Sequence, residues 1–227
     1  MKLCDRFAVI SSTSGSVLER VLERDSDFRQ RLRLVVTDRS CGAESVATRF
    51  GVHHVRIGEV SGIVFSNRLQ EILIEESIAA AFLFFSRILS GPILEAFSGR
   101  LINFHPSLLP AFPGLKGFED GWRSSSILLG STVHFVDCGV DTGPVIQQTF
   151  LPVNRATDSR SVVRHRIFLQ QCASLSQVSD WFSKSRVVIR GRNKVIVKGA
   201  KYEDTGTFIP ALENPVAVGL VDAVSKS

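Results

Sequence analysis

Hydrophobic residues fall into two patterns along this chain. Short, continuous apolar runs rich in Val, Ile, Leu and Phe are typical of strands buried on both faces of a sheet. Longer stretches repeat apolar residues every three or four positions, as expected for helices that pack on one side. Strands are predicted over residues 7–10, 32–37, 53–57, 78–85, 101–105, 131–136 and 144–151, and helices over a segment that begins at 16 and over 41–50, 61–76 and 158–184.

The order of these elements predicts the fold class. Strands that alternate with helices favour an α/β fold, with a Rossmann-like, mostly parallel sheet and helices on both faces. We expect one domain over residues 1–185, followed by a C-terminal β-hairpin and tail over 186–227 that pack on the same domain. Apolar runs on both sides of Gly191 predict the hairpin. Residues 205–227 are expected to form an extended arm against this domain or a partner chain.

The strand over 101–105 carries polar residues within an apolar run. Because side chains alternate along a strand, Asn103 and His105 leave the same face. Pro106 ends the strand, and Asp141 follows on a later Gly-rich loop. Ligands of parallel sheets bind at the carboxyl ends of the strands, so these three polar side chains form a candidate site.

The three groups suit acyl transfer to an amine. Asn103 can donate hydrogen bonds to an oxygen that gains negative charge. His105 can donate to that oxygen or shuttle a proton, and Asp141 can accept a proton or hold an imidazolium in place. No nucleophilic side chain stands beside a base, so the substrate would bring its own nucleophile. A lone histidine on a strand is also often a hydrogen-bonded core residue, and that alternative stays open.

Several segments resemble one known family. They are residues 86–90, 103–110, 113–114, 130–136 and 140–144, which include Asn103-Phe104-His105-Pro106-Ser107-Leu108-Leu109-Pro110 and Val140-Asp141-Thr142-Gly143-Pro144. Together they look like the folate-dependent formyltransferases, over about residues 7–184. The branch of that family that acts on glycinamide ribonucleotide in purine biosynthesis is the most similar.

The resemblance implies a reaction and a set of site residues. A formyl group would pass from 10-formyltetrahydrofolate, the co-substrate, to the primary amine of a small molecule. Asn103, His105 and Asp141 fall on the catalytic positions of the family. Thr132 and His134 match residues beside them, with a structural role as the alternative. The folate-binding positions implied are Arg87, Ile88, Leu89, Val136, Asp137, Cys138, Gly139, Val140 and Asp141.

The turn before the first helix has two interpretations. The resemblance places a substrate phosphate at Gly15, Ser16 and Val17, where helix N-terminal amides would face an anion. A capping box of Ser16 and Glu19 would explain these residues by itself. Val17 departs from the family, which usually has Asn there, and the loss would weaken phosphate binding.

The acceptor site departs from the family at the long helix. The Gln and Glu that hold the ribose in the family align with Phe168 and Gln171. Gln171 lies on the inward stripe of the helix and can bind a hydroxyl, but without the strength of a charged acceptor. A satisfied inner-face amide is the alternative. The acceptor therefore stays open between glycinamide ribonucleotide and another amine, such as an amino sugar or a specialised metabolite.

Composition agrees with a cytoplasmic enzyme. The chain has 227 residues, 44% of them hydrophobic, which suffices for a sizeable core. The longest apolar stretch, 78–85, is far shorter than the roughly 20 residues of a membrane helix, and no N-terminal signal is visible. Cys4, Cys41, Cys138 and Cys172 show no metal-like spacing, so we expect reduced thiols and no metal. Cys138 is either an oxidation-sensitive loop thiol or a spectator.

The net charge of +5 suits anionic small molecules rather than nucleic acid. Aromatic residues are not interleaved with the basic ones, as a stacking platform would require. We expect no nucleic-acid or membrane partner, and we consider a homodimer. Three rivals are disfavoured. A tRNA formyltransferase needs a larger C-terminal domain, a formyltetrahydrofolate hydrolase carries a domain in front, and a non-catalytic folate-binding protein would be expected to lose one of the three catalytic positions.

Overall fold

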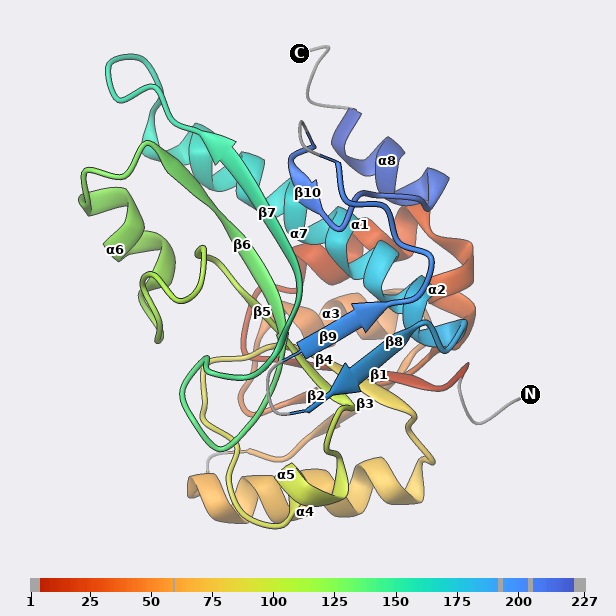
Figure 1. Ribbon diagram of the computed structural model, residues 1–227. Helices are drawn as coiled ribbons and strands as arrows, with labels where there is room; N and C mark the ends of the chain where they lie inside the picture. Colours follow the sequence, from red (N-terminus) through yellow and green to blue (C-terminus); the bar gives the residue numbers. More distant parts are fainter. Residues whose placement is uncertain (1–4, 59, 192–193, 204–205, 223–227) are drawn as a thin grey trace.

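The computed structural model describes residues 5–58, 60–191, 194–203 and 206–222. In this part of the chain, strands join in one large sheet of order β10-β7-β6-β5-β4-β1-β2-β3 (Figure 1). Neighbouring strands from β3 to β5 pair in parallel, and β6, β7 and β10 are antiparallel to their neighbours. The strands are β1 Phe7–Ser11, β2 Leu32–Thr37, β3 His53–Arg56, β4 Ala80–Phe84, β5 Leu101–His105, β6 Leu128–Phe135, β7 Val145–Pro152 and β10 Phe208–Ile209. The predicted α/β class and mostly parallel sheet are confirmed.

Helices cover both faces of this sheet, as predicted. On one face lie α1, α2, α3 and α7, whose apolar residues share a core with β1, β4 and β5. On the other face lie α4 and α5. The helices are α1 Ser16–Arg24, α2 Ser26–Arg31, α3 Gly42–Arg49, α4 Gly62–Glu75, α5 Ile93–Ala96, α6 Gly117–Arg123, α7 Arg160–Ser183 and α8 Pro215–Asp222. No helix in the described ranges is long and apolar enough to cross a membrane.

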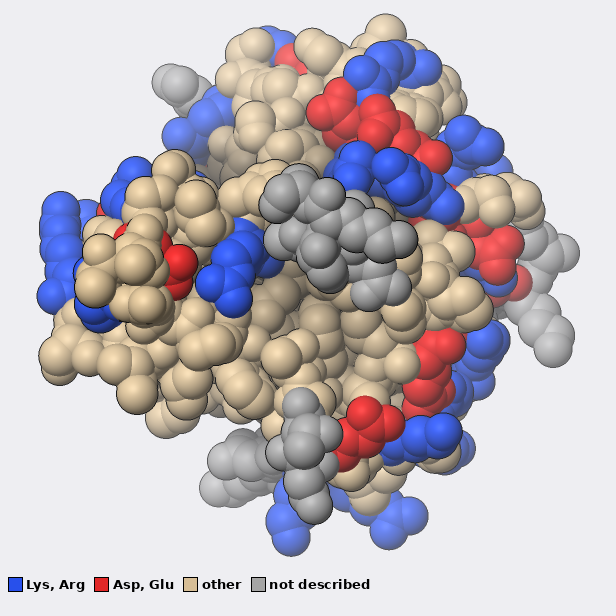
Figure 2. Space-filling view, turned by 90° about the horizontal axis from the view of Figure 1, so that it is seen from above, with Lys and Arg blue, Asp and Glu red and all other residues tan. Residues whose placement is uncertain are grey.

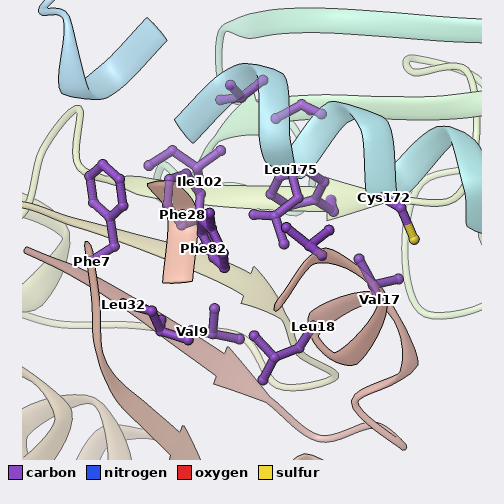
Figure 3. Packing of buried hydrophobic residues seen from close by; sticks show 14 of the residues in the cluster. Phe7, Val9, Val17, Leu18, Phe28, Leu32, Phe82, Ile102, Cys172 and Leu175 are labelled. Carbon is purple, nitrogen blue, oxygen red and sulfur yellow. The ribbon is translucent and has the colours of Figure 1, made fainter. Parts of the chain in front are cut away.

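The core beneath α7 explains why α1 forms where it does. Figure 3 shows Val17 and Leu18 of α1 close to Leu175 of α7. The predicted apolar stripe of α1 is buried throughout, with Val21 and Leu22 at 1% exposure or less. Burial of each such side chain contributes about 1.5–3 kcal/mol. This packing fixes the loop between β1 and α1, which borders the site described below.

Strand β5 separates core residues from polar ones as the alternation predicts. Ile102 and Phe104 belong to the core on the α7 side. Asn103 lies between these two residues, and His105 follows Phe104. Because side chains alternate along a strand, those of Asn103 and His105 leave the opposite face, at the carboxyl end of β5. Beyond β5, the β6–β7 hairpin packs on α6 and on the start of α7 through Phe118 and other apolar residues. This arrangement encloses the end of β5 from the side.

The C-terminal segment packs against α7 and β7. The predicted hairpin is confirmed as β8 Val187–Arg190 and β9 Lys194–Val197, although loop residues 192–193 lie outside the described residues. The expected extended form of the tail is wrong over residues 215–222, which form α8. Strand β10 pairs with β7, and α8 packs on α7. Residues 205 and 223–227, like Cys4, lie outside the described ranges.

Candidate active site

A cleft of about 670 Å³ lies at the carboxyl ends of β1, β4 and β5. Its volume falls within the roughly 300–1,000 Å³ that small-molecule sites occupy. The loops after these strands, the loop between β6 and β7 and the inner side of α7 line it. The cleft therefore lies at the edge of the sheet where ligands were expected from the sequence.

The three predicted catalytic side chains meet in this cleft. The Nδ1 atom of His105 lies 3.3 Å from Oδ2 of Asp141. The amide Nδ2 of Asn103 donates to Oδ1 of the same carboxylate at 3.4 Å. Two of these residues come from β5 and the third from a loop 36 positions beyond His105 in the sequence, so the fold brings them together.

His134 is a fourth member of the cluster. The antiparallel register between β5 and β6 places it opposite Asn103. Its Nδ1 lies 2.8 Å from the carbonyl oxygen of Phe135, which can only accept, so Nδ1 carries a proton. Its Nε2 lies 3.2 Å from Nδ2 of Asn103 and 3.5 Å from Oδ1 of Asp141. A neutral ring therefore accepts from Asn103, and a protonated ring donates to Asp141.

His105 faces a hydrogen-bond acceptor with each ring nitrogen. Its Nε2 lies 2.9 Å from the carbonyl oxygen of Phe112, and its Nδ1 faces Asp141. Burial lowers the pKa of His105, whereas the Phe112 carbonyl and the charge of Asp141 oppose that decrease. A neutral ring can satisfy only one of the two acceptors. An imidazolium would satisfy both, and Asp141 is placed to stabilise it.

Asp141 stays ionised at neutral pH. Burial would raise its pKa, but contacts with His134 and a 2.7 Å hydrogen bond from the amide of Gly114 lower the pKa to about 2. A carboxylate with such a pKa is a weak base near pH 7. Of the two roles that the sequence suggested for Asp141, holding an imidazolium fits this environment better than accepting a proton.

The positions implied for folate binding line the cleft, with one exception. The cleft is bordered by Arg87, Ile88, Leu89, Val136, Asp137, Gly139, Val140 and Asp141, whereas Cys138 is not among its lining residues and is exposed. Arg87 is fixed by a hydrogen bond to the carbonyl of Val60 and by an ion pair with the buried Asp38. Its guanidinium is therefore already engaged by groups of the protein.

The loop over residues 136–141 is organised by its own side chains. Asp137 accepts hydrogen bonds from the amide of Gly139 at 3.1 Å and from the hydroxyl of Thr142 at 2.7 Å. These bonds hold the loop in the turn that places Asp141 at the cleft. Asp137 thus shapes the loop. From the sequence alone, this structural role could not be distinguished from direct contact with a ligand.

The start of α1 differs from the predicted capping box. Ser16 and Val17 line the cleft, whereas Gly15 does not. Gly15 is the N-cap, with φ of 76°, and no side chain caps the helix. A Cβ at Gly15 would lie 2.7 Å from the backbone of Ala43, so only glycine allows α1 and α3 to approach this closely. The capping box of Ser16 and Glu19 is therefore wrong.

Helix α7 contributes a third wall of the cleft. Phe168 and Gln171 line it as predicted, and Gln171 donates to the hydroxyl of Ser131 at 3.4 Å. Sequence reasoning missed Arg164, which also lines the cleft and lies one helical turn before Phe168. Spacings of four and three residues place Arg164, Phe168 and Gln171 on one helix face, a signal that was available in the sequence.

Thr132 does not line the cleft. Its hydroxyl donates to the carbonyl of Ser107 at 2.7 Å and accepts from the amide of Leu109 at 3.0 Å. Of the two interpretations of Thr132, the structural one fits these bonds.

The sequence analysis also missed Gly117 as a residue of the site. A Cβ at Gly117 would lie 2.5 Å from Nε2 of His105, so a larger residue there would meet the ring.

The described residues show no metal-binding cluster, and their charges are mixed on the face shown in Figure 2. No cluster of three or more metal-ligating side chains occurs in the parts of the chain that the structure describes. On the face shown in Figure 2, basic residues lie in several separate groups, most of them beside acidic residues. The positive net charge is therefore not gathered into one basic surface on that face.

A sequence model of the formyl transferase family matches residues 5–178. The chain belongs to this family. The phosphoribosylglycinamide formyltransferase of Mycobacterium tuberculosis is 33% identical over 192 residues, 75% of this chain and 85% of that protein. The human trifunctional purine biosynthetic protein adenosine-3 is 33% identical over 179 residues, 72% of this chain and 17% of that protein.

Solved structures of this family share the fold. The crystal structure of glycinamide ribonucleotide transformylase 1 from Symbiobacterium toebii has a TM-score of 0.79 at 32% identity. The match covers 87% of this chain and 95% of that one. The family resemblance noted in the sequence is thereby confirmed.

Proposed function

We propose that this formyltransferase moves the formyl group of 10-formyltetrahydrofolate to the primary amine of glycinamide ribonucleotide, a step of de novo purine biosynthesis. The observation that carries the proposal is the meeting of Asn103, His105 and Asp141 in one cleft at the end of β5. This set offers hydrogen-bond donors and a fixed negative charge but no nucleophile of its own, as transfer to an amine requires.

The lining of the cleft supports a folate as its ligand. Its walls combine the backbone of two loops with apolar side chains, and Ile88, Leu115 and Val140 are exposed apolar residues among those that line it. Flat ring systems bind well between such surfaces, while backbone groups pair with the polar ring edge. When bound, 10-formyltetrahydrofolate would supply an activated formyl group.

Asn103 and His105 would stabilise the formyl oxygen as it gains negative charge. In the structure, Nδ2 of Asn103 is engaged with His134 and Asp141, and Nε2 of His105 faces the Phe112 carbonyl. A substrate oxygen would therefore have to replace one of these protein acceptors. Such a change is common, because catalytic hydrogen bonds often tighten only when the substrate is bound. Asp141 would hold the imidazolium of His105. The proton that the amine gives up would pass through water to the folate nitrogen from which the formyl group departs.

The acceptor would bind between the start of α1 and α7. Amides at the start of α1, near Ser16 and Val17, would face its phosphate. Gln171 would bind a ribose hydroxyl, because it lines the cleft and donates only weakly to Ser131. Phe168 would pack against an apolar part of the acceptor.

A second acceptor remains a candidate. Phe168 and Gln171 present an aromatic ring and a neutral amide, whereas the related ribonucleotide enzymes are expected to present polar and acidic groups there. This difference supports another amine, such as an amino sugar or a specialised metabolite, as the second candidate with the same formyl chemistry. A non-catalytic folate-binding role is less well supported, because all three catalytic positions are kept.

The experiment compares acceptors directly. The purified protein is given 10-formyltetrahydrofolate with glycinamide ribonucleotide or with amino sugars, and kcat/KM is measured from the loss of the formyl group. We expect the ribonucleotide to be the best acceptor. A higher kcat/KM for an amino sugar would reject the ribonucleotide and keep the formyl chemistry.

The proposal extends to the setting of the enzyme. We propose a cytoplasmic enzyme that has no nucleic-acid or membrane partner and forms a homodimer. Residues 1–185 and the tail over 186–227 would act as one folding unit. Sedimentation in the ultracentrifuge tests the dimer, and a monomer at micromolar concentration would reject it.

A further inference from the structure

The loop between β5 and α6 holds two members of the catalytic cluster through its backbone. The carbonyl of Phe112 lies 2.9 Å from Nε2 of His105. Two residues later, the amide of Gly114 donates to Oδ2 of Asp141 at 2.7 Å. The orientation of the imidazole and that of the carboxylate therefore depend on the path of residues 112–114.

Ser107 fixes that path. Its side chain is 4% exposed, and its hydroxyl proton is shared between the carbonyls of Ala111 at 2.7 Å and Phe112 at 3.1 Å. The Phe112 carbonyl thus receives hydrogen bonds from Ser107 and His105 together. Phe112 has φ of 57°, a left-handed conformation that is unfavourable for a bulky residue. Such a conformation persists only where surrounding contacts hold it.

The backbone of Ser107 is itself anchored to the sheet. Thr132 of β6 donates to its carbonyl and accepts from the amide of Leu109. Gln148 of β7 donates to the carbonyl of Leu109 at 2.8 Å and to the hydroxyl of Thr132 at 3.1 Å. The hydroxyl of Ser107 therefore projects from a rigid base, which allows it to position the more distant Phe112.

We propose that Ser107 is a positioning residue for formyl transfer, because its hydroxyl directs the Phe112 carbonyl that holds the ring of His105. The proposal rests on the proposed function, in which His105 stabilises the formyl oxygen. Misplacement of a reacting group by about 1 Å can cost two orders of magnitude in rate, so an indirect contact of this kind can matter.

The titration of His105 provides a readout that a merely structural role would not change. The groups that face this ring are Asp141, His134 and the Phe112 carbonyl. The carbonyl raises the pKa of His105 against the effect of burial, because it stabilises the ring N–H. Without the Ser107 hydroxyl, the Phe112 carbonyl would no longer be held against Nε2 of His105, and the hydrogen bond to the ring would lengthen. The titration midpoint of His105 should therefore move to lower pH.

The experiment compares Ser107→Ala with Ser179→Ala as the matched control. Ser179 is 3% exposed, and its hydroxyl also donates to a backbone carbonyl, that of Ser176, at 2.9 Å. The midpoint of His105 is measured by NMR on protein labelled in histidine, and kcat and KM for 10-formyltetrahydrofolate are measured separately. For Ser107→Ala we expect a lower midpoint, a kcat reduced about tenfold or more and a KM within about twofold. Ser179→Ala should match the wild type.

Two results would overturn the proposal. One is a His105 midpoint in Ser107→Ala equal to that of the wild type. The other is a loss of kcat that Ser179→Ala reproduces. The titration needs no substrate, so a shifted midpoint in a protein that transfers no formyl group would reject the proposed function while supporting the link between Ser107 and His105.

Discussion

Four groups surround the carboxylate of Asp141. Asn103, His134 and the amide of Gly114 lie around its carboxylate, and His105 faces it across 3.3 Å. Its backbone has φ of 56°, a conformation that Asp and Asn tolerate better than most residues. The carboxylate can therefore be replaced by an amide without a change in backbone strain.

Asp141→Asn should lower turnover by about 10² or more, because the charge that holds the His105 imidazolium is lost. The amide keeps the size and backbone preference of the aspartate. Single-turnover kinetics separate formyl transfer from substrate binding. Transfer near the wild-type rate would contradict the role given to Asp141.

The same substitution should reveal a pH-dependent contribution to stability. The pKa of Asp141 is about 2 in the folded protein against an ordinary 3.8, so the stabilisation is complete above 3.8 and disappears as pH falls through 2. It amounts to about 2 kcal/mol at neutral pH. Urea unfolding gives the difference in unfolding free energy between the wild type and Asp141→Asn. That difference should be larger at pH 6 than at pH 3 by about 1 kcal/mol. An equal difference at both pH values would contradict the lowered pKa.

At the scale of elements, the first residue of α6 packs directly on His105. A Cβ at Gly117 would lie 2.5 Å from Nε2 of His105 and 3.0 Å from the Phe112 carbonyl. Gly117→Ala should therefore displace the ring and reduce kcat by about 10². Gly219→Ala on α8 is the control, since nothing lies within 4 Å of that Cβ. It should keep full activity and gain up to about 1 kcal/mol in helix stability. Equal kcat values for the two variants would contradict the contact.

The sequence predicted the elements whose side chains carry a strong pattern. Continuous apolar runs located β1, β2 and β4, because strands buried on both faces have few other residues to use. Helices α2 and α6 were missed, since each is only six or seven residues long and too short for a periodic pattern. The tail was expected to be extended, but α8 forms because packing on α7 stabilises it.

The candidate site was predicted for side chains but not for backbone groups. Alternation along β5 placed Asn103 and His105 on one face, a later Gly-rich loop supplied Asp141, and the resemblance added His134. The carbonyl of Phe112 and the amide of Gly114 depend on the path of a loop, which residue types do not specify. The role of Ser107 follows from that path and could not be derived from its neighbours in the sequence.

At the scale of the whole molecule, the C-terminal segment tests whether the chain is one folding unit. Leu220 of α8 is 1% exposed and belongs to the core beneath α7, whereas Val218 is 37% exposed. If the tail folds with the rest, Leu220→Ala should lower the free energy of a single unfolding transition by about 2–5 kcal/mol. Val218→Ala should change it by less than about 1 kcal/mol. Calorimetry that resolves a separate transition for the tail would contradict the one-unit proposal.

The most direct test of the proposed reaction follows the folate itself. The protein is mixed with 10-formyltetrahydrofolate, and loss of the formyl group is recorded spectroscopically with and without glycinamide ribonucleotide, for the wild type and for Asp141→Asn. Our account predicts rapid loss only in the wild type with the ribonucleotide present, in proportion to the ribonucleotide added. Folate binding without ribonucleotide-dependent loss of the formyl group would contradict it.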